Sequence, residues 1–193
     1  MAGAEKSYAI ALVLSEKTAE KLNELRTDYQ QENDYVINPH LTLVYPFSPV
    51  FSLFQINEQL DKVAQRHQQF NITLNGIGFF ENGNNVVYAA LENIKPVKKL
   101  HTDIFRSLAD FIQYWNIDAD YNLEKYVPHV TIGTKIPDKI FPEIKKKYSR
   151  YRFRYEETIT QFSLFFENKG IWERKRVYKL DGKKAAQPKG EGG

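Results

Sequence analysis

Two histidines of this chain lie in the same short sequence motif, which contains residue types suited to proton transfer. The two copies read Pro39-His40-Leu41-Thr42-Leu43 and Pro128-His129-Val130-Thr131-Ile132. The chain has 4 histidines in all, so this setting holds half of them. With ordinary frequencies of Pro, Thr and apolar residues, the odds of such a repeat by chance are on the order of 10⁻⁶. Coincidence is therefore excluded as its explanation.

Both copies are typical of β-strands, since β-branched and apolar residues surround the central threonine. Side chains alternate between the two faces of a strand, so His40 shares a face with Thr42, and His129 with Thr131. The apolar residues of each copy point to the other face, where they can pack in a core. A single histidine on a strand more often makes only a structural hydrogen bond. Two histidines with the same spacing to a threonine favour a shared chemical role.

Two imidazoles that face each other across a cleft can act as an acid–base couple, because histidine titrates near neutral pH. One ring takes a proton from the attacking hydroxyl or water, while the other protonates the leaving oxygen. Thr42 and Thr131 can donate hydrogen bonds to a phosphate oxygen as charge builds up. This chemistry suits transfer or hydrolysis of a phosphodiester without a metal. The pattern leaves open which histidine is the base and which is the acid.

Other common catalytic arrangements are absent from the sequence. There are 0 cysteines, which excludes disulfide scaffolds, thiolate zinc sites and cysteine nucleophiles. The chain contains no His-Glu-x-x-His motif, no carboxylate cluster beside either motif and no Gly-x-Ser-x-Gly elbow. We therefore expect neither a metal nor a cofactor. His67 and His101 lie in predicted helices outside any motif, so we expect exposed or capping roles for them.

The net charge of +3 conceals an uneven distribution along the chain. Residues 1–134 carry 11 basic and 16 acidic side chains, a balance of −5, whereas residues 135–193 carry 16 and 8, a balance of +8. Arginines alternate with aromatic residues over 150–155, a pattern that can bind an anionic ligand such as RNA. A solvated lysine-rich surface is the plainer alternative.

Hydrophobic periodicity divides residues 8–180 into strands and helices. The segment 81–85, with its Asn-Gly pair, indicates a hairpin turn. The apolar run 8–14 is too short to span a bilayer, so we interpret it as the first strand of a cytoplasmic protein. We expect strands over 8–14, 41–44, 70–79, 86–91, 130–132, 161–167 and 171–180, and helices over 15–31, 52–67, 96–114 and near 142.

The order of these elements suggests two related halves, each with one His-x-Thr strand. We predict an α+β fold of bilobal, pseudo-twofold form, in which two antiparallel sheets face a central cleft and helices lie on the outside. Residues 1–182 are expected to form this single domain, because no low-complexity linker divides them. The Lys, Ala, Pro and Gly composition of residues 183–193 predicts a disordered basic tail.

The paired motifs, their separation and the chain length resemble the two-histidine (2H) phosphoesterase superfamily, which contains LigT-like 2′-5′ RNA ligases and cyclic phosphodiesterases. The similarity covers residues 8–180. It implies metal-independent action on 2′,3′-cyclic or 2′-5′ linked phosphates of RNA or nucleotides, in a central groove lined by His40, Thr42, His129 and Thr131. One difference concerns the phosphate clamp. Some relatives have Arg three residues after the second motif threonine, whereas this chain has Thr134 followed by Lys135.

Further side chains are candidates for contact with a base or with phosphate. We select Tyr45, Phe47, Lys135 and Trp172, with Phe79 and Phe80 as other stacking candidates. We expect an RNA or small nucleotide substrate, no membrane partner and a monomer. Two alternatives stay open: RNA 2′-5′ ligation through the same groove, and a non-catalytic module of this fold that binds RNA or nucleotides. Intact His and Thr in both copies count against the module.

Overall fold

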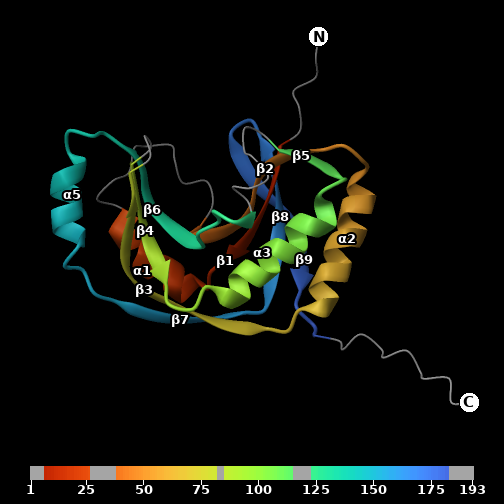
Figure 1. The fold of residues 1–193 in the computed structure, drawn as a ribbon, viewed down its shortest axis with the longest axis horizontal. Helices are drawn as coiled ribbons and strands as arrows, with labels where there is room; N and C mark the ends of the chain where they lie inside the picture. The colour runs from red at the N-terminus through yellow and green to blue at the C-terminus, as the bar shows by residue number, and fades with distance from the viewer. Residues whose placement is uncertain (1–6, 27–37, 82–84, 115–122, 183–193) are drawn as a thin grey trace, which may run out of the picture.

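The computed structural model describes residues 7–26, 38–81, 85–114 and 123–182, and the predicted tail 183–193 lies outside them. More of the described residues lie in strands than in helices (Figure 1). They are β1 (Tyr8–Val13), β2 (His40–Pro49), β3 (Phe70–Phe80), β4 (Asn85–Leu91), β5 (Ile112–Tyr114), β6 (His129–Ile136), β7 (Arg154–Ile159), β8 (Gln161–Asn168) and β9 (Ile171–Lys179). The helices are α1 (Glu16–Arg26), α2 (Leu53–Arg66), α3 (Lys95–Leu108) and α5 (Phe141–Tyr148).

The strands form one curled antiparallel sheet in the order β7-β3-β4-β6-β2-β1-β8-β9, with β5 paired to β2. The strands that carry the two His-x-Thr motifs, β2 and β6, are neighbours at the centre of this order, where Leu41 lies opposite Val130. We call β2, β1, β8 and β9 the β2 lobe, and β6, β4, β3 and β7 the β6 lobe. The motif strands therefore form the junction between the lobes.

Helices flank the sheet on the outer sides of the two lobes (Figure 1). Helices α2 and α3 pack on each other, with α3 against β2 and α2 against β9, while α1 lies against β6. Helix α5 lies at the edge of the β6 lobe, where the ring of Phe141 is 6.1 Å from that of Phe79. The predicted bilobal α+β arrangement is confirmed, and the two predicted sheets are continuous at the β2–β6 junction. Among the described residues, no helix is long and apolar enough to cross a membrane.

The lobes in space are not the two halves of the sequence. Helix α1 follows β1 of the β2 lobe but packs on β6, and β8 and β9 return from the C-terminal part to complete the β2 lobe. Glu157 of β7 accepts hydrogen bonds from the backbone N–H of Ser15 at 3.0 Å and from the hydroxyls of Ser15 and Thr18 at 2.9 and 2.7 Å. The chain thus interlocks the lobes and holds the motif strands between them.

The two motif strands repeat each other in register as well as in sequence. Strand β2 has a bulge opposite β1 just after Thr42 and another before Phe47. Strand β6 has the same two irregularities opposite β4, after Thr131 and before Ile136. A bulge reverses the alternation of side chains, so two successive residues, Leu43 and Val44, are both buried in β2. Residues after the first bulge therefore change face relative to an ideal strand.

Two predicted helices differ from those found. Helix α1 is described to Arg26, and residues 27–31 of the predicted helix lie outside the described part of the chain. Helix α3 ends at Leu108, so the predicted extension to residue 114 is wrong. Ile112 lies opposite Pro49 in the pairing of β5 with β2, and the backbone N–H of Val50 donates to the carbonyl of Phe111 at 2.9 Å. This tertiary pairing overrides the local helical pattern.

Candidate active site

The four motif side chains lie on one face of the β2–β6 junction. Because Leu41 lies opposite Val130 in an antiparallel pair, the next position on either side sets each motif histidine beside the threonine of the other motif. The resulting neighbours are His40 with Thr131 and Thr42 with His129. In a regular antiparallel sheet, side chains directly opposite each other have Cβ atoms about 4.5–5.5 Å apart, and diagonal neighbours are roughly 7–8 Å apart. Leu41 and Val130 point to the other face and are fully buried.

Each motif imidazole is anchored in the same way by the backbone just before it. Nδ1 of His40 lies 3.0 Å from the carbonyl oxygen of Asn38, and Nδ1 of His129 lies 2.8 Å from that of Val127. A carbonyl oxygen can only accept, so Nδ1 carries a proton and donates it in this bond. In the neutral ring, Nε2 is therefore the basic nitrogen. The two rings offer equivalent atoms for proton transfer.

Burial lowers the pKa of both motif histidines below the usual value, because it disfavours the charged imidazolium. The carbonyl oxygens bound to Nδ1 partly oppose this effect. For His40, positive charge on Arg26 and on His129 lowers the pKa further. The two rings therefore interact, and a proton on one disfavours a proton on the other, as in an acid–base couple.

Buried side chains from outside the motifs hold the backbone of both motif strands. The hydroxyl of Tyr126 donates to the carbonyl oxygen of Thr42 at 2.8 Å. The guanidinium of Arg26 donates from Nη2 and Nε to the carbonyl oxygen of Thr131 at 3.1 and 3.3 Å. Tyr126 and Arg26 are only 1% and 3% exposed. The backbone next to each imidazole is thus fixed from the interior of the protein.

Sequence reasoning missed both of these residues, although a signal was present for one. Arg26 follows Ala19 and Leu22 at helical spacing, so it occupies the inward face of α1, and all three are buried. A charged residue on an otherwise apolar face indicates a specific polar partner inside the protein. Tyr126 carries no comparable signal, because it lies outside the regular elements and only the tertiary structure brings it to Thr42.

The two histidines outside the motifs are buried, so the expectation of exposure is wrong for both. His101 is 1% exposed, its Nδ1 lies 2.6 Å from the carbonyl oxygen of Leu43, and its ring stacks on Tyr126 with centroids 3.8 Å apart. His67 is 7% exposed, and its Nε2 lies 2.8 Å from Oδ2 of Asp103. Packing of α2 against α3 covers these positions. A capping role is confirmed for His67, which ends α2.

The structure places the four residues that were predicted to contact a base or phosphate in different surroundings. The first bulge puts Tyr45, which is half-buried, on the face of the motif histidine. Phe47 is fully buried with its ring 6.1 Å from that of Tyr8, so its prediction as a base contact is wrong; the second bulge returns it to the core. Trp172 lies on β9, separated from β2 by β8 and β1, and is not brought to the motifs. Lys135 is exposed near the end of β6, with a φ of 55°.

Aromatic rings surround His129 on the β6 lobe. The ring centroid of His129 lies 5.0 Å from that of Phe80 and 5.3 Å from that of Tyr88, and Phe80 and Tyr88 stack at 4.4 Å. Tyr88 lies across Gly78, where an added Cβ would be 2.2 Å from the phenol ring, so glycine is needed there. Phe80 therefore lies at the site, whereas Phe79 packs on α5. Tyr88 was not foreseen.

A polar hollow of about 420 Å³ lies between the start of α1 and strand β7, and none of the four motif residues lines it. Its wall includes Asn38, whose carbonyl binds the His40 ring, and Val13, which lies opposite His40 on β1. Across residues 7–26, 38–81, 85–114 and 123–182, no three His, Asp or Glu side chains gather as a metal site would require. The described groups around the motifs thus suit proton transfer and hydrogen bonding.

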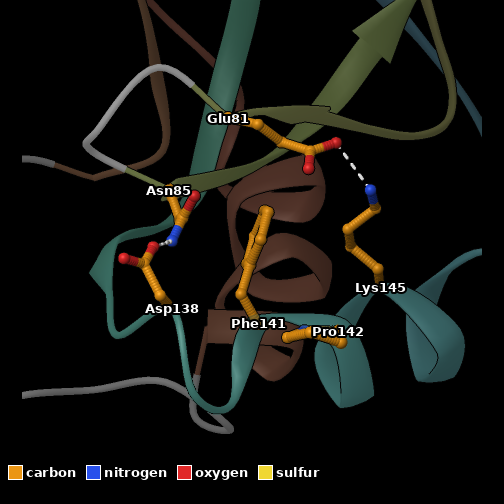
Figure 2. A pocket seen from close by; sticks show the side chains of 6 residues that line it. All are labelled: Glu81, Asn85, Asp138, Phe141, Pro142 and Lys145. Atoms are coloured by element: carbon orange, nitrogen blue, oxygen red, sulfur yellow. Dashed lines mark hydrogen bonds and ion pairs between the residues drawn. The ribbon is translucent and has the colours of Figure 1, made fainter.

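A second hollow, of about 410 Å³, lies between the β3–β4 hairpin and α5 (Figure 2). Asn85 donates to Asp138 at 2.6 Å, and Lys145 pairs with Glu81 at 2.5 Å, so these polar groups are bonded to one another. None of the motif residues lines it. This hollow is separate from the candidate active site.

Comparison with known proteins agrees with the motif and the fold. Residues 14–170 match the model of the 2′-5′ RNA ligase superfamily. A protein of Oceanobacillus iheyensis named "putative phosphoesterase" is 28% identical over 161 residues, which cover 83% of this chain and 89% of that protein. A Geobacillus protein with the same name is 26% identical over 178 residues, covering 91% of this chain and 97% of the relative.

Solved structures share the architecture. A protein of Thermus thermophilus superposes with a TM-score of 0.65 at 20% identity, covering 92% of this chain and 100% of that one. E. coli LigT in complex with 3′-AMP superposes with a TM-score of 0.62 at 17% identity, covering 92% and 99% of the two chains. With its repeated motif and the match over most of its length, this chain belongs to the 2′-5′ RNA ligase superfamily of two-histidine phosphoesterases.

Proposed function

We propose that this protein is a metal-independent phosphodiesterase that uses His40 and His129 as an acid–base pair on 2′,3′-cyclic or 2′-5′ linked phosphates of RNA or nucleotides. The observation that carries the proposal is two imidazoles anchored alike at Nδ1, on one face of adjacent strands, each beside a threonine. Relatives named as phosphoesterases support the reaction class. Complexes of E. coli LigT with 3′-AMP and with ATP support a nucleotide ligand.

In the proposed reaction, the phosphate lies over the four motif side chains. Nε2 of one neutral imidazole takes a proton from the water that attacks phosphorus. The other imidazole, which starts protonated, gives its Nε2 proton to the ester oxygen as the bond from that oxygen to phosphorus breaks. Thr42 and Thr131 donate hydrogen bonds to the non-bridging oxygens, whose charge rises in the transition state. The pair ends with its protonation reversed, and proton exchange with solvent restores it.

Groups around the motifs supply binding contacts in this proposal. Tyr45 shares the motif face of β2, and Lys135 adds a cation near the end of β6. The stacked pair of Phe80 and Tyr88 beside His129 offers an aromatic surface for a base. These contacts replace the arginine that some relatives have after the second motif.

A substrate screen in EDTA tests the function. The full chain is incubated with 2′,3′-cyclic nucleotides, 2′-5′ oligonucleotides and cyclic dinucleotides, and the products are identified. We expect hydrolysis of one of the first two classes. Thr42→Val should slow the reaction about tenfold or more, because it removes one donor to the transition state. Thr158→Val, at an exposed strand position of β7, is the matched control and should leave the rate unchanged.

The other outcomes separate the alternatives. Joined products from RNA fragments with 2′,3′-cyclic phosphate and 5′-hydroxyl ends would indicate the ligase. Tight binding without turnover in any class would indicate the binding module. Activity that disappears in EDTA and returns with zinc or magnesium would contradict the proposed mechanism.

A further inference from the structure

The alternation of arginine and aromatic residues over 150–155 forms a surface that the proposed reaction does not use. Residues 145–155 contain 6 basic and 0 acidic side chains. This segment runs from α5 into β7, which is the outermost strand of the β6 lobe (Figure 1). Strands β3 and β4 separate β7 from the motif strand β6. The surface is therefore distinct from the candidate active site.

Four aromatic rings follow one another along this segment. The ring centroid of Tyr151 lies 6.2 Å from those of Tyr148 and Phe153. The rings of Phe153 and Tyr155 stack at 4.9 Å, with their planes 19° apart. Tyr148, which is buried, anchors one end of the row, and at the other end Nζ of Lys21 on α1 lies 4.9 Å from the centre of the Tyr155 ring. The two rings in the middle are thus held in place from both sides.

The middle of this row is open to solvent. Tyr151 is 43% exposed, and Phe153 is half-buried. A ring that its neighbours already hold in place loses little conformational freedom when a planar group stacks on it. Nucleic-acid bases are planar groups of this kind, and every base has a face that can stack. The row therefore offers a preorganised platform for bases.

Two exposed arginines, Arg150 and Arg152, flank Tyr151 in the sequence. Nη1 of Arg152 donates to the carbonyl oxygens of Ser149 and Tyr151 at 2.7 and 3.0 Å, which fixes the guanidinium next to the ring. Backbone carbonyls carry no net charge, so the positive charge of Arg152 is not neutralised by these bonds. Among the residues that the structure describes, neither arginine forms an ion pair. Both charges are therefore available to an anionic ligand.

Acidic partners neutralise basic residues only towards the two ends of the segment. Lys145 pairs with Glu81, and Arg154 pairs with Glu92. The positive charge that remains is at the centre of the segment, where the exposed ring also lies.

We propose that Arg150, Tyr151, Arg152 and Phe153, here called the Tyr151 surface, bind a single-stranded polynucleotide outside the catalytic groove. The arginines contact phosphates, and the rings stack on unpaired bases. A duplex keeps its bases within its own stack, and an acidic peptide has carboxylates but no bases to place on the rings. The Tyr151 surface contains no motif residue, so the proposal does not depend on the proposed function. A long RNA substrate would gain a second point of attachment there.

Fluorescence anisotropy with a labelled oligouridylate of about 12 nucleotides, a usual length for a single-strand site, tests the stacking contact. Tyr151→Ala should weaken binding by roughly five- to hundredfold, because it removes one stacking platform. Tyr151→Phe keeps the ring and should bind like the wild type. Phe54→Ala is the matched control, because Phe54 is a 70% exposed ring on α2, and it should leave the affinity unchanged.

The salt dependence of the same binding tests the phosphate contacts independently of Tyr151. Arg150→Gln and Arg152→Gln should each lower the slope of log Kd against log salt concentration by about 0.7, the value for one phosphate contact on a single strand. Arg106→Gln, at an exposed position of α3, is the matched control and should leave the slope unchanged. Wild-type slopes in both variants of the Tyr151 surface would overturn the proposal.

Competition with unlabelled ligands identifies the class of partner. Oligothymidylate should compete, and its strength relative to oligouridylate shows whether the surface prefers DNA or RNA. Duplex RNA and polyglutamate should compete poorly. If either displaced the probe as well as oligouridylate does, binding would rest on charge alone and the proposal would be overturned.

Turnover of a 2′,3′-cyclic mononucleotide separates the Tyr151 surface from the catalytic groove. This ligand is too small to reach across three strand spacings of about 4.8 Å from β6 to β7, so its kcat/KM should be the same in all these variants. If Tyr151→Ala bound the oligonucleotide like the wild type, the strand would be held elsewhere, and the proposal would fail. Intact oligonucleotide binding without any turnover would refute the proposed function and leave the Tyr151 surface in place.

Discussion

The hydroxyl of Tyr126 lies 2.8 Å from the carbonyl oxygen of Thr42, so a residue three positions before His129 holds the strand of the first motif. Arg26 makes the reciprocal contact, from the helix that precedes the first motif to the carbonyl oxygen of Thr131. Each motif is thus held by a side chain that lies near the other motif in sequence. The relative position of the two imidazoles depends on these two contacts.

Tyr126→Phe tests this contact through stability. The variant leaves a buried carbonyl without its donor, which costs about 1–3 kcal/mol of the free energy of unfolding. Urea denaturation should show this loss, together with a lower kcat. Tyr151→Phe changes a tyrosine that is 43% exposed and should shift the free energy of unfolding by less than about 0.5 kcal/mol. Equal effects of the two variants would show that the bond to Thr42 adds no stability.

The two motif histidines should behave as one catalytic unit. His40→Ala and His129→Ala should each lower kcat/KM on the natural substrate by roughly 10²–10⁴, which is the usual contribution of a general acid or base. The double variant should be little worse than either single one, because the remaining ring cannot work alone. Steady-state kinetics on the three variants measure this. If the loss of kcat/KM in the double variant equalled the product of the two single losses, the two histidines would have independent roles.

The pH dependence of kcat/KM should form a bell, because one ring must start neutral and the other protonated. Burial lowers the pKa of both rings, so both limbs shift to lower pH relative to an ordinary imidazole at ~6.5. The maximum should therefore lie on the acid side of pH 7, and the profile should be the same in EDTA. A rate that continues to rise through pH 9 would point instead to a metal-bound hydroxide.

Stability should fall as the solution becomes acidic, because burial lowers the pKa of His40, His67, His101 and His129. A lowered pKa means that the folded state binds fewer protons than the unfolded state below pH ~6.5. The stabilisation is therefore complete above that pH and is lost as the pH falls towards the folded-state values. Urea unfolding between pH 7.5 and 5 measures the slope, which should be smaller in His101→Gln. A flat profile would contradict the burial of these rings.

Much of the candidate site follows from local rules. Alternation along a strand is a property of the backbone, so the spacing of His40 and Thr42, repeated at His129 and Thr131, places each pair on one face whatever strand lies beside it. The same local logic predicted the β3–β4 hairpin and helix α2, whose buried residues follow helical spacing. The repeat in sequence also predicted a repeat in structure, and the matched bulges of β2 and β6 follow the same repeat.

Long-range pairing decided the rest. Tyr45 lies on the face of His40 because the first bulge opposite β1 reverses the alternation, and the second bulge restores it before Phe47, which lies in the core; a bulge depends on the partner strand. Ile112 is in a strand because the end of β2 lies beside it. Arg26 reaches Thr131 across 105 positions of sequence, a contact that exists only because α1 crosses to the other lobe. Sequence by itself therefore determined which side chains form the repeated motif, because alternation along a strand is local, and the tertiary structure decided which buried side chains hold the two motif strands.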